Sequence, residues 1–259
     1  MSLDDLTEQL ADAARELGSE DVEHTLEKGV HLAVEMIEGC DGAGVTIVHR
    51  GPTLETPVST EDWIAYADAL QVELQEGPCT DAIWDEEMIH VPDLANEKRW
   101  PIWGPRVVKE LGVRSMLCIQ LYADEDTVGA LNLYSKGVRA FESPEDRTEA
   151  LALAAHVAVA FVAAQEIEHL TKALTSRTVI GQAEGILMER FDIPAERAFQ
   201  VLKRISSHHN TKLFKVASEL VRTRRVPTQQ TTLDHAAPVG NYPEVYATHG
   251  AALQDVGEQ

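Results

Sequence analysis

Two stretches decide how the C-terminal part folds: SRTVIGQAEGILMER at residues 176–190 and AERAFQVLKRISSHHNTKLFKVASELV at residues 195–221. In both, apolar residues recur three or four positions apart, which predicts amphipathic helices. Residues 166–226 hold 11 Lys and Arg against 7 Asp and Glu, a charge of +4, whereas residues 1–165 carry −21. An acidic chain that collects positive charge on one helical module indicates a surface for an anion, and nucleic acid is the first candidate.

Length, composition and cysteine content restrict the class of protein. With 259 residues, 44% of them apolar, the chain can hold two modest domains with a core each. It has no run of about 18 apolar residues and no basic, apolar start, so we expect neither a membrane span nor a secretory signal. Cys40, Cys79 and Cys118 form no CxxC pair, so we expect no disulfide framework and no metal site. We therefore expect a cytoplasmic protein.

The N-terminal part mixes short helices with strands, after a helical segment at residues 1–20. We predict helices at 20–38, 61–76, 79–85 and 105–111, and strands at 43–48, 54–59, 88–91, 115–122 and 128–134. Because the strands follow one another as hairpins, the expected fold class is α+β with an antiparallel sheet.

The C-terminal part is predicted to be all α, beginning with one long helix over residues 144–191. A coiled-coil seam with spacings of three and four along this helix predicts the contact of a homodimer, formed by Ala160, Ala163, Ile167, Leu170 and Leu174. Pro194 fits the first turn of the next helix, and Asn210 or Thr211 is expected to cap a third. Residues 227–259 show no apolar period, and we expect them to be disordered.

Residues 170–226 resemble the ANTAR domain, an RNA-binding antiterminator module, through ALTSRTVIGQAEGILMER, AERAFQVLKRIS and N-x-KL-x-x-VA. The resemblance implies a three-helix bundle over residues 166–226 that binds a pair of small RNA hairpins as a homodimer, without catalysis. Many members of the family have Lys where this chain has Glu184. If this position faces RNA, Glu weakens binding; if it faces the dimer partner, an ion pair can form.

The candidate RNA contacts divide into two sets. Ser206, Asn210, Lys212 and Lys215 cluster around the turn before the third helix, where amides and ammonium groups suit phosphates and loop bases. Lys203, Arg204, Arg190 and Arg197 are expected to contact phosphates without sequence preference. The alternative for Ser206 and Asn210 is that they only tie the turn. The expected packing residues are Ala173, Leu174, Ile180, Ala183, Ile186, Leu187 and Phe199, and Gly181 and Gly185 indicate a close helix–helix approach.

Residues 21–165 resemble a GAF domain. The matching stretches are EGPCTDAIWDEEMIHVPDLANEKRWPIW, GVRSMLCIQLY, VGALNLYSKGVRAFESPED and AAHVAVAF. The resemblance implies an antiparallel sheet of about six strands with helices on both sides, acting as the sensor of a small molecule. A GAF domain before an ANTAR domain implies a one-component regulator, here a signal-responsive transcription antiterminator whose RNA targets and signal the sequence does not name.

The ligand of the sensor domain is left open by the sequence. Trp63, Cys79, Trp100, Trp103 and Cys118 are the candidates to line its pocket. Haem is a possible cofactor through His90 or His156. Asn132 and Lys136 loosely resemble the cyclic-nucleotide signature of some GAF domains, but they are not adjacent as that signature requires, which favours structural roles.

Two other functions remain as alternatives. Helices at 194–207 and 211–223 could form a DNA-binding helix-turn-helix, but the third helix offers Lys212, Lys215 and Glu219, which suit backbone contacts better than base recognition. A thiol enzyme such as a methionine sulfoxide reductase would use Cys79 and Cys118. These cysteines are not closely spaced and no other catalytic motif occurs, so we expect no enzyme.

Overall fold

The computed structural model describes residues 3–18, 21–49, 53–84, 87–123 and 126–226. The chain divides into two compact units, Met1–Ala173 and Leu174–Gln259. The segment 227–259, predicted to be disordered, lies outside the described residues. The first unit contains a sheet with helices, and the described part of the second unit is entirely helical.

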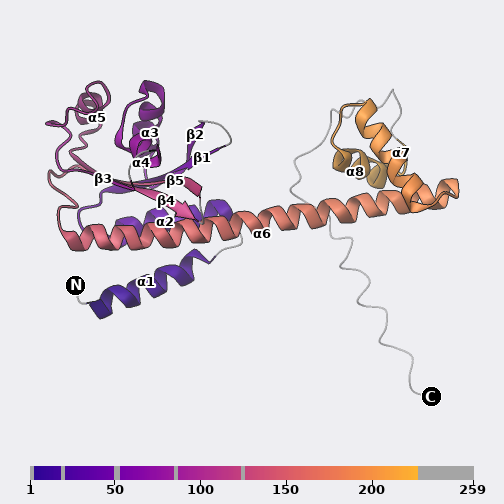
Figure 1. Ribbon diagram of the computed structural model, residues 1–259, viewed down its shortest axis with the longest axis horizontal. Helices are drawn as coiled ribbons and strands as arrows, with labels where there is room; N and C mark the ends of the chain where they lie inside the picture. Colours follow the sequence, from indigo (N-terminus) through magenta and orange to yellow (C-terminus); the bar gives the residue numbers. More distant parts are fainter. Residues whose placement is uncertain (1–2, 19–20, 50–52, 85–86, 124–125, 227–259) are drawn as a thin grey trace, which may run out of the picture. The chain divides into compact units, whose positions relative to one another are not determined.

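Within the described residues, five antiparallel strands form one sheet in the order β2-β1-β5-β4-β3 (Figure 1). Their bounds are Gly42–Val48 for β1, Leu54–Ser59 for β2, Met88–Val91 for β3, Ser115–Ala123 for β4 and Asp126–Ser135 for β5. The α+β class and the antiparallel sheet are confirmed, with five strands where the resemblance implied about six. The central strand β5 pairs with both β1 and β4.

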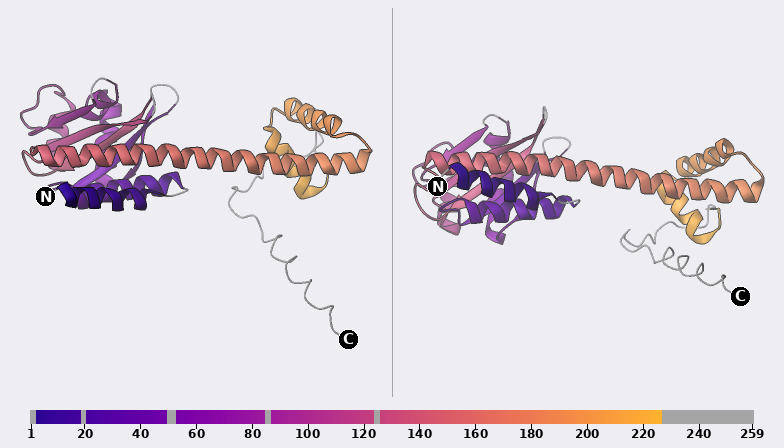
Figure 2. Two further views of the ribbon diagram at one scale, coloured as in Figure 1. Left: turned by 60° about the horizontal axis from the view of Figure 1, so that its bottom comes forward. Right: turned by 90° about the horizontal axis from the view of Figure 1, so that it is seen from below.

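Helices cover both faces of this sheet (Figures 1 and 2). One face carries α2 (Val22–Met36) and the first part of α6 (Pro144–Phe191), and α1 (Leu3–Leu17) packs against these two helices. The other face carries α3 (Asp62–Leu74), α4 (Pro78–Trp84) and α5 (Trp103–Leu111). Because side chains alternate along a strand, Leu131 and Leu133 of β5 join the first core and Tyr134 joins the second. Each core is therefore closed by one layer of helices.

The contact between α2 and α6 is unusually close at Gly29. A Cβ at this position would lie 2.9 Å from Cγ2 of Val157, so only glycine lets the two helices approach this far. The start of α2 is set by Asp21, whose carboxylate accepts hydrogen bonds from the amides of Glu23 and His24 at 2.9 and 3.3 Å. These contacts fix the start of α2 and its position against α6.

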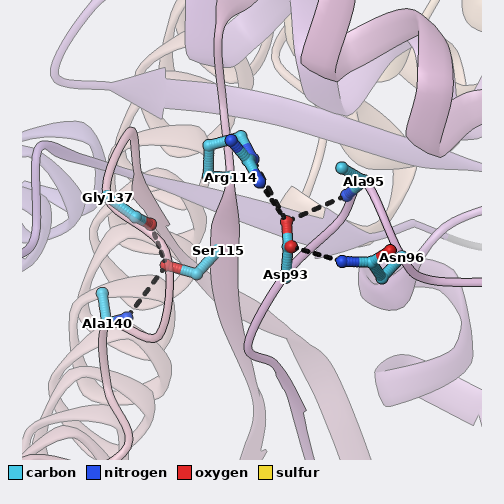
Figure 3. A network of polar contacts seen from close by, with 7 residues as sticks. All are labelled: Asp93, Ala95, Asn96, Arg114, Ser115, Gly137 and Ala140. Atoms are coloured by element: carbon cyan, nitrogen blue, oxygen red, sulfur yellow. Dashed lines mark hydrogen bonds and ion pairs between the residues drawn. The ribbon is translucent and has the colours of Figure 1, made fainter.

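A polar network at the start of β4 holds the loop that follows β3 (Figure 3). The carboxylate of Asp93 accepts hydrogen bonds from Arg114 at 2.9 and 3.1 Å, from the Ala95 amide at 3.2 Å and from the Asn96 side chain at 2.7 Å. The Ser115 hydroxyl bonds twice to the backbone of the turn after β5. The loop predicted over 93–103 is thereby anchored where it leaves the sheet.

The long helix α6 runs without a break over 48 residues, which confirms the helix predicted at 144–191. Among the described residues it is the one helix long and apolar enough to cross a membrane, although it contains no uninterrupted run of 18 apolar residues. Leu153, Val157 and Phe161 of this helix are buried in the first core, and 39% of its most apolar window is buried.

The second unit is a bundle formed by the C-terminal part of α6 with α7, Ala195–His208, and α8, Leu213–Thr223. Its core consists of Val179, Ala183, Leu187, Ala198, Leu202, Val216, Ala217 and Leu220. Ile180 and Ile186 pack against this core as predicted. Ala173, Leu174 and Phe199 do not, because they are exposed, with 67% of Leu174 and 36% of Phe199 accessible.

One further prediction for the bundle is wrong: Lys212, and neither Asn210 nor Thr211, is the N-cap residue of α8. The turn before α8 is closed by the Ser206 hydroxyl, which donates to the Thr211 carbonyl at 2.6 Å. Within this one chain, no described atom outside their own helix lies within 4 Å of a Cβ at Gly181 or Gly185, so the close helix–helix approach expected there stays a prediction for a second chain.

Candidate nucleic-acid interface and ligand site

The predicted cations lie on the exposed surface of the second unit. Arg197, Lys203 and Arg204 are exposed on α7, Lys212 and Lys215 at the start of α8, and Arg190 in the last turn of α6. Among the described residues, Lys203, Arg204, Lys212 and Lys215 form no ion pair with a carboxylate. Arg222 differs, because Glu219 holds it at 2.7 Å. The four lysine and arginine side chains therefore keep their N–H donors for an external anion.

The turn between α7 and α8 presents Asn210 next to these cations. Asn210 is exposed and has a left-handed backbone with φ of 47°. Ser206 is partly buried and its hydroxyl is used to close the turn, which favours the structural role for this residue. The first turn of α8 contains no acidic residue, so the positive end of its helix dipole is not neutralised there.

The five predicted pocket residues come together on one face of the sheet, beneath α3, α4 and α5. Trp103 is fully buried and donates from Nε1 to the Ala67 carbonyl at 3.1 Å, and Trp100 donates to Asp81 at 2.9 Å. Trp63 packs edge-on against Tyr134, with 5.7 Å between the ring centroids. Cys79 and Cys118 lie in the same core.

A buried polar cluster lies in this core, centred on Asp68 of α3. The carboxylate is 2% exposed and accepts hydrogen bonds from the Tyr134 hydroxyl, from Asn132 and Thr56 at 3.1 Å, and from Gln71 at 3.2 Å. Burial raises the pKa of Asp68 to about 6, and the four hydrogen bonds lower it only in part. We call Thr46, Thr56, Asp68, Gln71, Cys79, Asn132 and Tyr134 the Asp68 cluster.

Asn132 is the second centre of the Asp68 cluster. Besides Asp68, its Nδ2 faces Thr46 Oγ1 at 3.0 Å and Cys79 Sγ at 3.3 Å. Its Oδ1 is buried and, among the described residues, has no hydrogen-bond partner. The Gln71 carbonyl oxygen accepts from the Cys79 amide at 2.8 Å, which connects the cluster to the start of α4.

Sequence reasoning missed Asp68, Gln71, Thr46 and Thr56, and it gave Asn132 only a structural role. One signal was available, because Asp68 lies among apolar residues of its helix, where a carboxylate is costly. Gln71 lies one turn away on the same helix. Thr46, Thr56, Asn132 and Tyr134 come from β1, β2 and β5, and they meet only through the strand pairing. Trp63, Trp100 and Trp103 were predicted to line a pocket from their residue type alone, because no sequence pattern showed where they pack.

The thiols and histidines do not form a reactive centre. Burial, and then the nearby Asp68 charge, raise the pKa of Cys79 to about 12, and burial raises that of Cys118 well above its usual value. Both thiols therefore stay protonated, which disfavours thiolate chemistry. His90 and His156 each bond a backbone carbonyl, at 3.0 and 2.7 Å. No group of three or more His, Cys, Asp or Glu suited to a metal occurs in the described residues.

Family comparisons agree with this architecture. The sequence model of the GAF domain matches residues 1–162, and that of the ANTAR domain matches residues 168–221. The first match covers more than half of the sequence, so the chain belongs to the GAF domain family. The ANTAR domain that follows makes it a GAF–ANTAR regulator. No curated protein sequence matches it significantly.

Solved structures with a similar fold include two phytochromes. The bacteriophytochrome RpBphP3 from the photosynthetic bacterium R. palustris has a TM-score of 0.54 at 12% identity, covering 72% of this chain and 43% of that one. The Stigmatella aurantiaca phytochrome photosensory core module has a TM-score of 0.53 at 12% identity, covering 76% and 43%. The chain thus spans less than half of either structure, and at such identities the likeness shows the fold alone.

Proposed function

We propose that this chain is a transcription antiterminator that holds a two-hairpin RNA as a homodimer and is controlled by a small molecule bound to its GAF domain. The GAF–ANTAR architecture supports a sensor-regulated RNA-binding regulator in general terms. We propose further that this regulator has no catalytic role. The observation that carries the finer proposal is the group of four cations on α7 and α8, Lys203, Arg204, Lys212 and Lys215, which form no ion pair within the part of the chain that the structure describes. Such a regulator would act in the cytoplasm.

The RNA contacts follow from the positions of these cations. Lys212 and Lys215 lie three residues apart at the positive end of α8, so both can approach one phosphate group or two neighbouring ones. Lys203 and Arg204 extend the positive surface along α7. Asn210, exposed in the turn, can donate to and accept from an unstacked loop base.

The homodimer is proposed to form through α6. Its exposed apolar face consists of Val159, Ala163, Ile167, Leu170 and Leu174, four or three residues apart. The exposed fractions of Val159 and Leu170 are 64% and 58%. Ala160, which the sequence placed in this seam, instead packs partly buried against the first core, so Val159 takes its position. A second copy of α6 would remove this face from water. Gly181 and Gly185 offer room for such a helix.

The signal would reach α6 through the central strand. Asn132 and Tyr134 of β5 face the Asp68 cluster, whereas Leu131 and Leu133 face the core that contains α6. A ligand that moves β5 therefore also acts on the packing of α6. It can shift the regulator between two arrangements only by its difference in affinity for them.

The test is a titration of the purified full chain against a two-hairpin RNA with six-base loops. A loop-scrambled RNA and a DNA duplex of equal charge are the controls. Selective binding of the first RNA supports the proposal. Equal binding of all three contradicts it and reduces the surface to general electrostatics, and tighter binding of the duplex would favour DNA recognition instead.

A further inference from the structure

The Asp68 carboxylate has no positively charged partner among the described residues. Its four donors, from Tyr134, Asn132, Thr56 and Gln71, are all neutral groups. Buried carboxylates are normally paired with a cation, because neutral hydrogen bonds do not replace the hydration that the charge loses. The cluster therefore leaves one negative charge that the surrounding protein does not neutralise.

The second unmatched group is the side-chain oxygen of Asn132. Asp68 accepts and does not donate when ionised, so the amide nitrogen of Asn132 must be the atom that faces it. The same nitrogen lies 3.0 Å from Thr46 Oγ1 and 3.3 Å from Cys79 Sγ, both of which can accept a hydrogen bond from it. Oδ1 is left buried with both lone pairs unused. Such an acceptor destabilises the fold unless a donor reaches it.

A proton complements only one of these two groups. While the amide keeps the orientation that ionised Asp68 requires, protonation neutralises Asp68 and supplies no donor to Oδ1 of Asn132. An amide that turns over after protonation would accept from the Asp68 hydroxyl, and this is the outcome in which the proton alone is the ligand. A group with positive charge and several N–H donors complements both. We propose that the Asp68 cluster is the recognition centre of the GAF domain and binds a small organic cation with N–H donors, a primary ammonium or an amidinium. This inference rests on the proposed role of the GAF domain as a sensor and names the class of its ligand.

Gln71 connects the Asp68 cluster to α4, so a ligand bound to the cluster can change the position of this helix. The side-chain nitrogen of Gln71 donates to Asp68 at 3.2 Å, and its carbonyl oxygen accepts from the Cys79 amide at the start of α4. A ligand N–H that takes over the Gln71 donor position frees this side chain. The beginning of α4 then loses its attachment to α3, so binding alters the helical layer over the sheet.

Asp68 is the group whose charge a mild pH change alters here. The other titratable groups facing the cluster are Tyr134 of β5, Cys79 of α4 and Cys118 of β4, and burial raises the pKa of each. Asp81 of α4 is bonded to the Trp100 ring nitrogen. Since a cation and a proton compete for Asp68, binding of the cation must weaken as the pH falls below about 6.

The experiment measures the melting temperature of the full chain at pH 7.5 and constant ionic strength. Methylammonium and acetamidinium chloride are the probes, and tetramethylammonium chloride is the cation without N–H donors. We expect the N–H cations to raise Tm by about 3 °C at a tenfold excess over Kd, and tetramethylammonium to leave it unchanged. The Asp68→Asn variant should lose the response, and Asp62→Asn, an exposed change on the same helix, should keep it.

If Asp68→Asn does not fold, the pH series on the natural chain decides. The shift caused by methylammonium should shrink between pH 7.5 and pH 5. An equal shift with tetramethylammonium, or no shift with either N–H cation, overturns the proposal, and a pH effect without a cation effect would make the proton the ligand. RNA is absent from this assay, so a failure of RNA binding is recorded separately from a failure of cation binding.

Discussion

The pH dependence of folding stability is the sharpest consequence of the Asp68 cluster. The pKa of Asp68 rises from its ordinary 3.8 to about 6 in the folded protein, because burial disfavours the charged form. The folded state therefore binds this proton more tightly than the unfolded state does. The stabilisation is fully present below about pH 3.8 and is lost as the pH rises through about 6.

The size of the effect follows from the difference between the two pKa values. At 1.36 kcal/mol per unit, ionisation of Asp68 lowers the free energy of unfolding by about 2 kcal/mol between pH 4 and pH 8. Replacement by Asn removes the titrating group, so the difference in stability between Asp68→Asn and the natural chain should change by this amount over the same range. Other carboxyl groups contribute equally to both proteins and cancel.

The assay is urea unfolding followed by tryptophan fluorescence, which buried Trp100 and Trp103 report. Asp62→Asn is the matched control, because it removes an exposed carboxylate from the same helix. Its stability should run parallel to that of the natural chain at every pH. A constant difference between Asp68→Asn and the natural chain from pH 4 to pH 8 would refute the perturbed pKa, whatever the absolute stability of the variant.

Three further predictions concern the other sites. Replacing Lys212 and Lys215 together by Ala should weaken RNA binding and reduce the slope of log K against log salt by about 1.5–2, measured by titration at several salt concentrations; an unchanged slope would place the RNA surface elsewhere. Leu174→Asp should convert a dimer to a monomer in light scattering, because it puts a charge into an apolar helix seam, and an unaltered mass would exclude this seam. Cys79 and Cys118, protonated and buried, should react with a thiol reagent only after unfolding, and fast labelling of the native chain would contradict their environment.

The amino-acid sequence alone determined the elements and their order. Both ends of the 48-residue helix α6 were predictable, because the apolar spacing is a local property, Pro144 suits a first helical turn and Pro194 is the N-cap residue of the next helix. The two-domain assignment was also available, since the GAF and ANTAR motifs are contiguous stretches. The cations of α7 and α8 could be placed outside for the same reason, because the buried positions Ala198 and Leu202 fix the inner face of α7.

Only the tertiary structure shows which helix faces are covered by other elements and which polar groups come into contact. Spacing placed Ala160 in the dimer seam, but the packing of α6 on the sheet turns it toward the first core and leaves Val159 outside. Asp68 and Asn132 lie 64 residues apart and meet at 3.1 Å because α3 packs over β1 and β2, next to β5 in the sheet. The spacing of apolar residues along a helix or strand shows which residues share a face. Contact between distant segments depends instead on strand register and helix packing, which local sequence patterns do not determine.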